Sequence, residues 1–529
     1  MAENKYTNIP KEKFTFVHEG ERISDKKFDD KPIGYLKDAW IRFRKSRAAV
    51  IAAIIILVIV AYSFITPLLY IGKYDQSFMV AQYAKKPARV TWLRDNLGIL
   101  DGGVDRTKVT EAEMIRLSAI AIGAQDTEGT GKVSLAEAKD NAYSPFLSVS
   151  NPIEGLNAKK QKVNFYNIRV DAYLEVGFVF RYIEQSELQK ILDFQEQTGL
   201  QVLYPLIEDN EYHPDLEDAN TWYKAKRVGH PVKFNASGTP VNVAYSDNMV
   251  LEDNYRRDKT TGEPLYWDYS GGGTLETAQL KIRVLYYNYY QYLYGFEPNY
   301  IMGTEAQGYD MALRIADGIK LSLFIAIAVF VINFIIGAAY GAVEGYYGGV
   351  LDLVLERISD ILNGVPFIIV ATLFQLHLAK KVGPLPSLLF AFVLTGWIGT
   401  AYRVRTQFYR FKNQEYVMAA RTLGARDRRI IWKHIFPNTL GTLITSSALA
   451  IPSTIMSESM LSYLGIVSLG GTSGTSLGTL LSDAEGIWTS FPHLMLYPAL
   501  VISLLMICFN LFGNGLRDAF NPALRGVEE

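Results

Sequence analysis

Residues 48–70 read AAVIAAIIILVIVAYSFITPLLY and contain no charged side chain. An uncharged apolar run of about 20 residues is long enough to cross the hydrocarbon core of a bilayer as one helix. It is longer than the apolar part of a signal peptide, and it lacks a convincing small-residue cleavage site. We therefore predict a permanent first transmembrane helix at 48–70.

The segment before this run indicates its direction across the membrane. The first 35 residues are polar and have no apolar core of the kind found in secretory signals. Basic side chains then precede the run directly, at Lys37, Arg42, Arg44, Lys45 and Arg47. Because Lys and Arg accumulate on cytoplasmic flanks, we expect the N-terminal tail, residues 1–47, to be cytoplasmic.

Five further apolar runs follow residue 310, at about 319–341, 365–379, 385–402, 439–464 and 494–513. Three are short or interrupted by Gly and Pro, which buried helices tolerate because neighbours satisfy the freed backbone groups. Together with the first run they predict six spans. The loop 403–438 is rich in Arg and Lys, and Arg517 and Arg525 follow the last run. Both clusters favour a cytoplasmic loop and a cytoplasmic C-terminal tail, 521–529, as six spans require.

A long polar segment, residues 71–310, separates the first run from the others. It contains helix-like patterns at 109–123 and 184–197 and a β-rich run at 164–182. About 240 residues can bury a core of their own. The predicted fold is therefore an all-α polytopic membrane protein with six transmembrane helices, five of them in a core at 311–520. An α+β domain is inserted at 71–310 on the extracytoplasmic side.

Composition excludes several classes of function. The 53 Lys and Arg balance 54 Asp and Glu, so no overall positive charge indicates nucleic-acid binding. The single cysteine, Cys508, excludes a disulfide framework within the chain. The sequence contains no phosphate-binding Gly–Lys–Ser/Thr loop, no nucleophile elbow and no His/Cys metal cluster. We therefore predict a chain without catalytic activity and without a bound cofactor of its own.

The segment EYVMAARTLGARDRRIIWKHIFPN, residues 415–438, carries the strongest functional pattern. Glu415–Leu423 is predicted to form a short helix that Gly424 terminates, since glycine is common at helix C-termini. A second, basic helix is predicted at 425–435, and Pro437 marks the return to the membrane. A helix with small residues permits close approach, and the arginines around it can pair with acidic rims of another protein.

This pattern resembles the EAA loop of bacterial ABC importer permeases. By that resemblance the coupling helix that docks into an ATP-hydrolysing subunit contains Glu415, Ala419, Ala420, Arg421 and Gly424. Four further segments resemble the oligopeptide/dipeptide branch, and specifically its second, C-type permease subunit: GTEAQGYD at 303–310, LERISD at 355–360, LSYLG at 461–465 and FNLFGNGLRDAFNP at 509–522. Departures from the branch pattern occur at Glu305, Tyr309, Asn514 and Asn521, and the long insert has no counterpart in it.

The resemblance implies a peptide importer in the bacterial cytoplasmic (inner) membrane, with both termini inside. It implies a homologous permease chain, two ABC ATPase subunits that hold the ATP, and an extracytoplasmic solute-binding protein as partners, besides membrane lipid and without nucleic acid. Nickel and glutathione importers share the branch, so the cargo stays open. A signal transducer that moves the insert without transporting anything is the alternative from another class.

Two further sites can be considered. Glu458 lies in the fifth apolar run, where an ionisable residue suggests a place on the substrate path or, alternatively, a packing contact. In the insert, DTEGTGKVSLAE at 126–137 follows the spacing of an EF-hand calcium loop. A calcium ion would be held at Asp126, Glu128, Thr130, Lys132, Ser134 and Glu137, and a metal-free turn before a helix is the alternative. The tyrosines of 286–294 suggest either an exposed docking surface or a buried helix.

Overall fold

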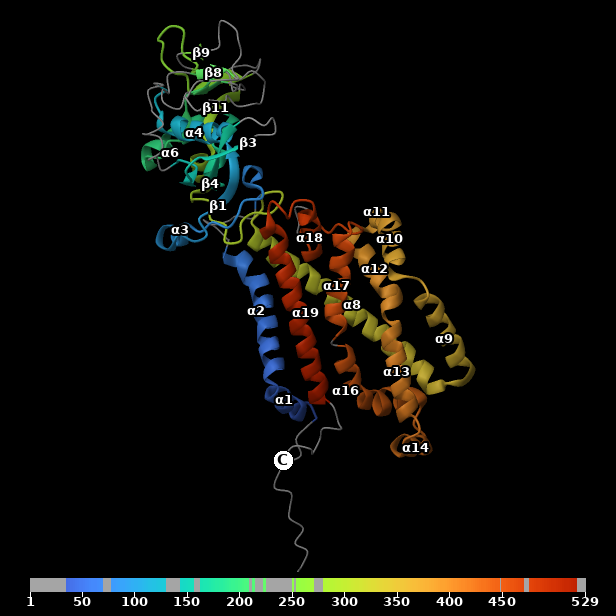
Figure 1. The fold of residues 1–529 in the computed structure, drawn as a ribbon. Coiled ribbons are helices and arrows are strands. Elements are labelled where there is room, and N and C mark those ends of the chain that lie inside the picture. The colour runs from blue at the N-terminus through green and yellow to red at the C-terminus, as the bar shows by residue number, and fades with distance from the viewer. Residues whose placement is uncertain are drawn as a thin grey trace, which may run out of the picture.

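The computed structural model describes residues 35–69, 78–129, 143–156, 162–208, 212–214, 222–224, 250–251, 254–270, 279–447, 449–470 and 475–520. Long helices form one part of the molecule and the strands gather in a second part beyond one end of these helices (Figure 1). The first part holds α1 (Tyr35–Lys45), α2 (Arg47–Leu69), and every helix from α8 onward. The second part, here called the α+β region, lies between α2 and α8 in the sequence.

Four helical stretches are long and apolar enough to cross a membrane: α2, α8 (Met311–Tyr347), α12 with α13 (Pro384–Phe411) and α19 (Pro492–Phe520). A fifth is obtained if α9 (Gly349–Asn363) and α10 (Phe367–His377), which meet at a bend of 72°, count as one span. The predicted run at 439–464 is divided between α16 (Phe436–Ser447) and α17 (Ala450–Tyr463). Each of these two helices is too short to cross a bilayer alone, so the described residues give four or five candidate spans where the sequence predicts six.

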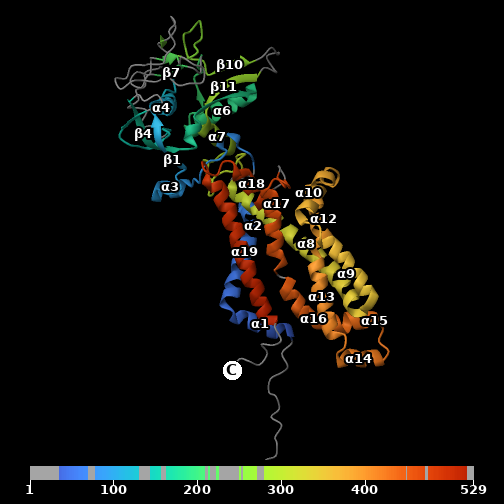
Figure 2. The same cartoon turned by 45° about the vertical axis from the view of Figure 1, so that its right-hand side comes forward.

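Short helices connect the long ones. They are α11 (Ala379–Val382), α14 (Glu415–Thr422), α15 (Asp427–Arg429), a π-helical turn at Ile430–Ile435, and α18 (Leu477–Glu485). Helices α11 and α18 lie at the end of the bundle that faces the α+β region, whereas α1 and α14 lie at the opposite end in both views (Figures 1 and 2). The basic residues of α1 and of the loop after α13 therefore share one end of the bundle.

Glycines allow α8 and α13 to pack at close range. Gly337, Gly341 and Gly345 recur every four residues and so lie on one face of α8. A Cβ built on Gly341 would stand 2.2 Å from the carbonyl oxygen of Ala401, and the other two glycines meet the α13 backbone nearly as closely. Small residues at such a spacing are common where membrane helices touch. This contact positions α13, and with it the loop that follows.

The described residues of the α+β region form three antiparallel sheets. One has β4 (Lys162–Asp171) between β1 (Gly103–Thr110) and β2 (Phe146–Val149), with β3 (Ile153–Leu156) also on β4. In the second, β11 (Gln279–Leu285) pairs with β10 (Trp267–Ser270), β5 (Phe178–Ile183) and β6 (Leu203–Tyr204). The third is formed by β7 (Tyr212–Pro214), β8 (Trp222–Lys224) and β9 (Val250–Leu251). The β-rich run at 164–182 is present as β4 and β5, separated by a turn and the 3-10 helix Leu174–Val176.

The helices described in this region are α3 (Thr91–Leu97), α4 (Glu111–Gln125), α6 (Gln185–Thr198) and α7 (Tyr286–Tyr294), with a 3-10 turn at Ala81–Tyr83. The helices predicted at 109–123 and 184–197 are present as α4 and α6. Tyr286, Tyr287, Tyr289 and Tyr290 of α7 are buried in a core with Tyr83 and Tyr173. Of the two interpretations of the tyrosine run, the structure supports the buried helix.

The GTEAQGYD segment, residues 303–310, lies at the junction between the two parts, and its residues have structural roles there. Asp310 caps α8 by accepting hydrogen bonds from the backbone N–H groups of Ala312 (2.7 Å) and Leu313 (3.4 Å). Gly308 has a φ of +96°, and a Cβ there would stand 2.1 Å from the carbonyl oxygen of Val80. The segment therefore has mainly structural requirements: a capped helix start and a glycine where two backbones meet.

Candidate functional site

Helix α14 ends in a glycine cap. The N–H of Ala425 donates to the carbonyl oxygen of Ala420 (3.0 Å), and the N–H of Gly424 donates to that of Arg421 (3.0 Å). These two hydrogen bonds form a Schellman motif, which needs a left-handed residue at its centre. Gly424 provides it, with a φ of +81°. The helix end predicted from the sequence is thus present.

One face of α14 is anchored to the bundle. Val417 is fully buried in a cluster with Phe408 of α13 and Ile430 and Ile431 of the π-helical turn. Tyr346 of α8 donates a hydrogen bond to Asp427 (2.6 Å) and accepts one from Arg421 (3.4 Å). Direct contacts therefore attach α14 to α8 and α13.

The other face of α14 is exposed and apolar at its centre. Leu423 is 89% exposed and Met418 is 55% exposed, while Tyr416 and Ala419 also reach the surface. Four of the predicted coupling residues, Glu415, Ala419, Arg421 and the capping Gly424, are exposed, and Ala420 is half-buried. The sequence pattern did not single out Met418, although it directly precedes Ala419. A large exposed apolar side chain beside small ones suits contact with another protein.

An ion cluster fixes α13 to α9. Arg405 donates to Asp352 (2.7 and 2.9 Å) and to Glu356 (2.9 and 3.2 Å), and Glu344 of α8 lies 3.7 Å away. The hydroxyl of Tyr409 also donates to Asp352. Several of the acidic residues of the core are thus used in holding helices together.

Glu458 lies in α17 and is fully enclosed, with 0% of its surface exposed. Ser322 of α8 donates to one of its carboxylate oxygens (3.1 Å) and Ser462 to the other (3.0 Å). It does not line the cavity described next. A place for Glu458 on the substrate path stays a prediction, and its geometry in the described residues is that of a packing contact.

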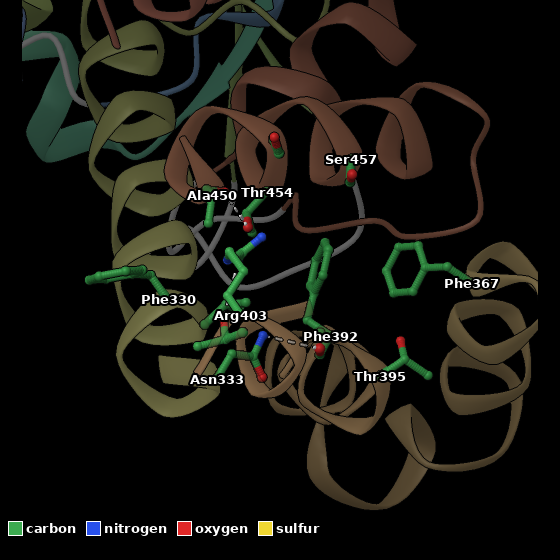
Figure 3. A pocket seen from close by; sticks show the side chains of 13 residues that line it. Phe330, Asn333, Phe367, Phe392, Thr395, Arg403, Ala450, Thr454 and Ser457 are labelled. Carbon is green, nitrogen blue, oxygen red and sulfur yellow. Dashed lines mark hydrogen bonds between the residues drawn. The ribbon is translucent and has the colours of Figure 1, made fainter. Parts of the chain in front are cut away.

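A cavity of about 370 Å³ lies between α8, α10, α12, α13 and α17 (Figure 3). Phenylalanine rings, hydroxyl groups, one amide and one guanidinium line it. The lining residues are Val329, Phe330, Asn333, Phe367, Phe392, Thr395, Gly396, Thr400, Arg403, Ala450, Ser453, Thr454 and Ser457. Sequence reasoning missed this site, although Asn333 stands out as a polar residue within the second apolar run.

The calcium-loop prediction falls largely outside the described residues. Thr130, Lys132, Ser134 and Glu137 belong to that part of the chain. Asp126 is buried and Glu128 is exposed, and they follow α4 directly. No group of three or more His, Cys, Asp or Glu side chains suited to a metal occurs among the residues that the structure does describe. The calcium site stays a prediction.

Comparison with known proteins shows which family this chain belongs to. The family described as "binding-protein-dependent transport system inner membrane component" matches residues 335–526, and the "N-terminal TM domain of oligopeptide transport permease C" matches residues 34–87. The chain is 39% identical to the oligopeptide transport system permease protein OppC of Bacillus subtilis, over 42% of this chain and 72% of the relative. The same protein of Escherichia coli is 35% identical, over 43% and 73%. The dipeptide transport system permease protein DppC of Bacillus subtilis is 39% identical, over 42% and 68%.

A solved structure of the MetNI methionine ABC transporter, in an inward-facing conformation, is 17% identical and covers 40% of this chain and 98% of the solved chain, with a TM-score of 0.34. That score is too low to support an argument. The sequence matches and the apolar helices define this chain as a multi-pass permease of the inner membrane. It belongs to the binding-protein-dependent transport permeases, in their oligopeptide/dipeptide branch. Residues 88–334, which include most of the α+β region, lie outside both family matches.

Proposed function

We propose that this chain is the C-type permease subunit of an ATP-driven peptide importer, which couples to its ATPase through α14. The observation that carries the proposal is the exposed face of α14 around Leu423, on a helix whose other face is anchored to α8 and α13. ATP is bound and hydrolysed on two partner subunits, and closure of these subunits moves α14. The movement reorients the bundle and opens the path to the other side.

The proposed mechanism includes a topology of six spans. Four of the spans are α2, α8, α12–α13 and α19. The other two are the pairs α9–α10 and α16–α17, each counted as one broken span. Each broken pair connects the α14 end of the bundle to the end near the α+β region (Figures 1 and 2). The basic residues then lie on the cytoplasmic side with both termini, and the α+β region lies outside.

The partner chains follow from this arrangement. A homologous permease chain lies beside this one in the membrane, and the cargo path runs between the two. A solute-binding protein delivers peptide at the outer end, where the α+β region stands over the bundle. We assign docking of that binding protein to the α+β region.

The assignment of α14 as the coupling helix can be tested by introducing one negative charge on its exposed face. In the assembled complex, Leu423→Asp removes about 1.5–3 kcal/mol of apolar burial at the ATPase contact and places a carboxylate there. The ATPase subunits should bind at least tenfold more weakly, measured by titration onto the permease pair in nanodiscs. The control is Asn413→Asp, which introduces the same charge at an exposed position just before α14. Equal binding by both variants would reject α14 as the coupling helix.

The docking role of the α+β region can be tested by deleting most of this region while keeping the backbone pairing where it joins the helices. Arg89 and Tyr300 exchange two backbone hydrogen bonds of 2.8 Å. Residues 90–299 can therefore be replaced by a two-residue Asn-Gly turn that closes a hairpin on this pair. The shortened chain should assemble and bind the ATPases, while stimulation of ATP hydrolysis by the binding protein falls. Full stimulation would exclude a docking role for the α+β region.

A further inference from the structure

The cavity between α8, α10, α12, α13 and α17 contains an arginine that has no acidic partner within the described part of the chain. Arg403 is half-buried, and its Nε has no hydrogen-bond partner among the described residues. Its only hydrogen bond there is to the hydroxyl of Thr400, at 3.4 Å. Among the residues that the structure describes, no Asp or Glu lines the cavity. Figure 3 shows Arg403 between the rings of Phe330 and Phe392, with Thr454 nearby.

Arg405, two residues further along α13, shows what a structural arginine looks like in this bundle. Two carboxylates and a third at 3.7 Å surround its guanidinium. Because successive residues turn by about 100° on a helix, Arg405 faces α9 while Arg403 faces the cavity. A charged group between membrane helices is costly unless it is paired, so an unpaired one on a cavity wall is a sign of function.

A second polar group in the cavity also has an atom without a hydrogen-bond partner among the described residues. Asn333 of α8 is only 8% exposed, and its Oδ1 has no hydrogen-bond partner among the described residues. Its Nδ2 donates to the carbonyl oxygen of Phe392 at 3.4 Å. A Cβ on Gly396 would stand 2.3 Å from that Nδ2, so the glycine leaves room for the amide. The packing of α8 against α12 therefore fixes the position of the Asn333 amide.

These groups select a ligand class. A guanidinium pairs with a carboxylate through two parallel hydrogen bonds, and a carboxamide oxygen accepts from a peptide N–H. Phenylalanine rings and hydroxyl groups on the remaining walls accept varied side chains. The volume of about 370 Å³ lies within the roughly 300–1,000 Å³ typical of small-molecule sites. It suits one end of a peptide better than a bare metal ion, because the described lining residues offer such an ion no carboxylate or imidazole.

From this arrangement we infer that the cavity is a cargo subsite in which Arg403 binds the C-terminal carboxylate of a peptide and Asn333 accepts its terminal N–H. The inference rests on the proposed function and adds to it. It distinguishes peptides with a free carboxyl end from peptides that lack one. It also assigns to the permease itself a share of cargo selection.

The test uses the reconstituted complex in proteoliposomes with one solute-binding protein in every arm. The probes are radiolabelled tri-alanine and tri-alanine with a C-terminal amide. Arg403→Gln should raise the KM for tri-alanine at least tenfold and leave the KM for the amide within twofold of the parent complex. Arg403→Lys, which keeps the charge but not the paired donors, should recover part of the loss. Arg357→Gln is the control, since Arg357 is exposed on α9, where it pairs with Asp360 of the same helix.

The outcomes separate the inference from the proposed function. If the parent complex transports neither probe, peptide import itself is rejected. If it transports tri-alanine and Arg403→Gln leaves that KM unchanged, the subsite is rejected while import stands. If Arg403→Gln weakens both probes equally, Arg403 acts on packing or on the partner permease chain, and the subsite is again rejected. Basal ATP hydrolysis of each variant complex verifies assembly.

Discussion

Replacement of Gly424 tests the link between backbone conformation and coupling. Gly424 has a φ of +81°, yet a Cβ there would meet nothing within 4 Å. A substitution therefore introduces no clash, and its cost comes only from the left-handed backbone. That cost is about 1–2 kcal/mol for an ordinary residue, higher for a β-branched one and lower for asparagine.

The effect of this cost on α14 can be estimated from the hydrogen bonds of its C-terminal cap. Two hydrogen bonds of 3.0 Å close the last turn of an eight-residue helix, and both depend on the left-handed conformation. A cost of about 2 kcal/mol shifts the ratio of capped to uncapped helix roughly 30-fold, at 1.4 kcal/mol for each factor of ten. Leu423, which stands next to the cap, then loses its fixed position.

We expect Gly424→Val to reduce ATP-dependent peptide uptake at least fivefold, Gly424→Ala to reduce it less, and Gly424→Asn to keep at least half. Uptake is measured in proteoliposomes with equal amounts of assembled complex, and the Tm of each variant should stay within a few degrees of the parent. Equal uptake by the Val and Asn variants would refute the argument, because the left-handed backbone costs valine more than asparagine.

Three further predictions concern packing, protonation and topology. Gly341→Ala should lower the Tm of the purified chain, because overpacking costs about 1–3 kcal/mol, whereas Gly399→Ala, whose new methyl group meets nothing closer than 3.9 Å, should not. Burial raises the pKa of Glu305 from 4.5 to about 7, so its contribution to stability is full below pH 4.5 and is lost as the pH rises through 7. Glu305→Gln should therefore remove up to about 3 kcal/mol of pH dependence, seen as a flatter Tm profile between pH 5 and 8. In a chain with its native cysteine replaced, Ser186→Cys should react with an impermeant thiol reagent on intact spheroplasts and Asn413→Cys only after lysis, and the reverse labelling would overturn the orientation.

Apolar runs predicted the long helices well because their signal is local. The first run, 48–70, is present as Arg47–Leu69, and the last, 494–513, as the longer Pro492–Phe520. The second run begins at 319, whereas α8 begins at Met311, because its polar first turns are stabilised by the Asp310 cap and by burial at the junction. Breaks in the helices were harder to predict: Pro366 starts α10 at a bend, and Pro437 lies inside the start of α16.

The short helix of the coupling loop was predicted because a glycine determines its end. The segment after it was only partly predicted, since the expected helix at 425–435 is α15 followed by a π-helical turn that continues into α16. The cavity was not predicted. Which side of α13 faces α9 and which faces α17 depends on contacts between helices far apart in sequence, and no local pattern reports them. The same reason applies to the tyrosines of α7, whose burial depends on packing against Tyr83 and Tyr173.

The most direct test of the account is cargo uptake in cells that lack this chain. Uptake of a labelled oligopeptide, nickel and glutathione is measured in the deletion strain and in the strain with the gene restored. The account predicts that peptide uptake falls on deletion and returns on restoration, while nickel and glutathione uptake are unchanged. Peptide uptake that is unaffected by the deletion would contradict it, whether another cargo is lost, as in a nickel or glutathione importer, or none is, as in a signal transducer.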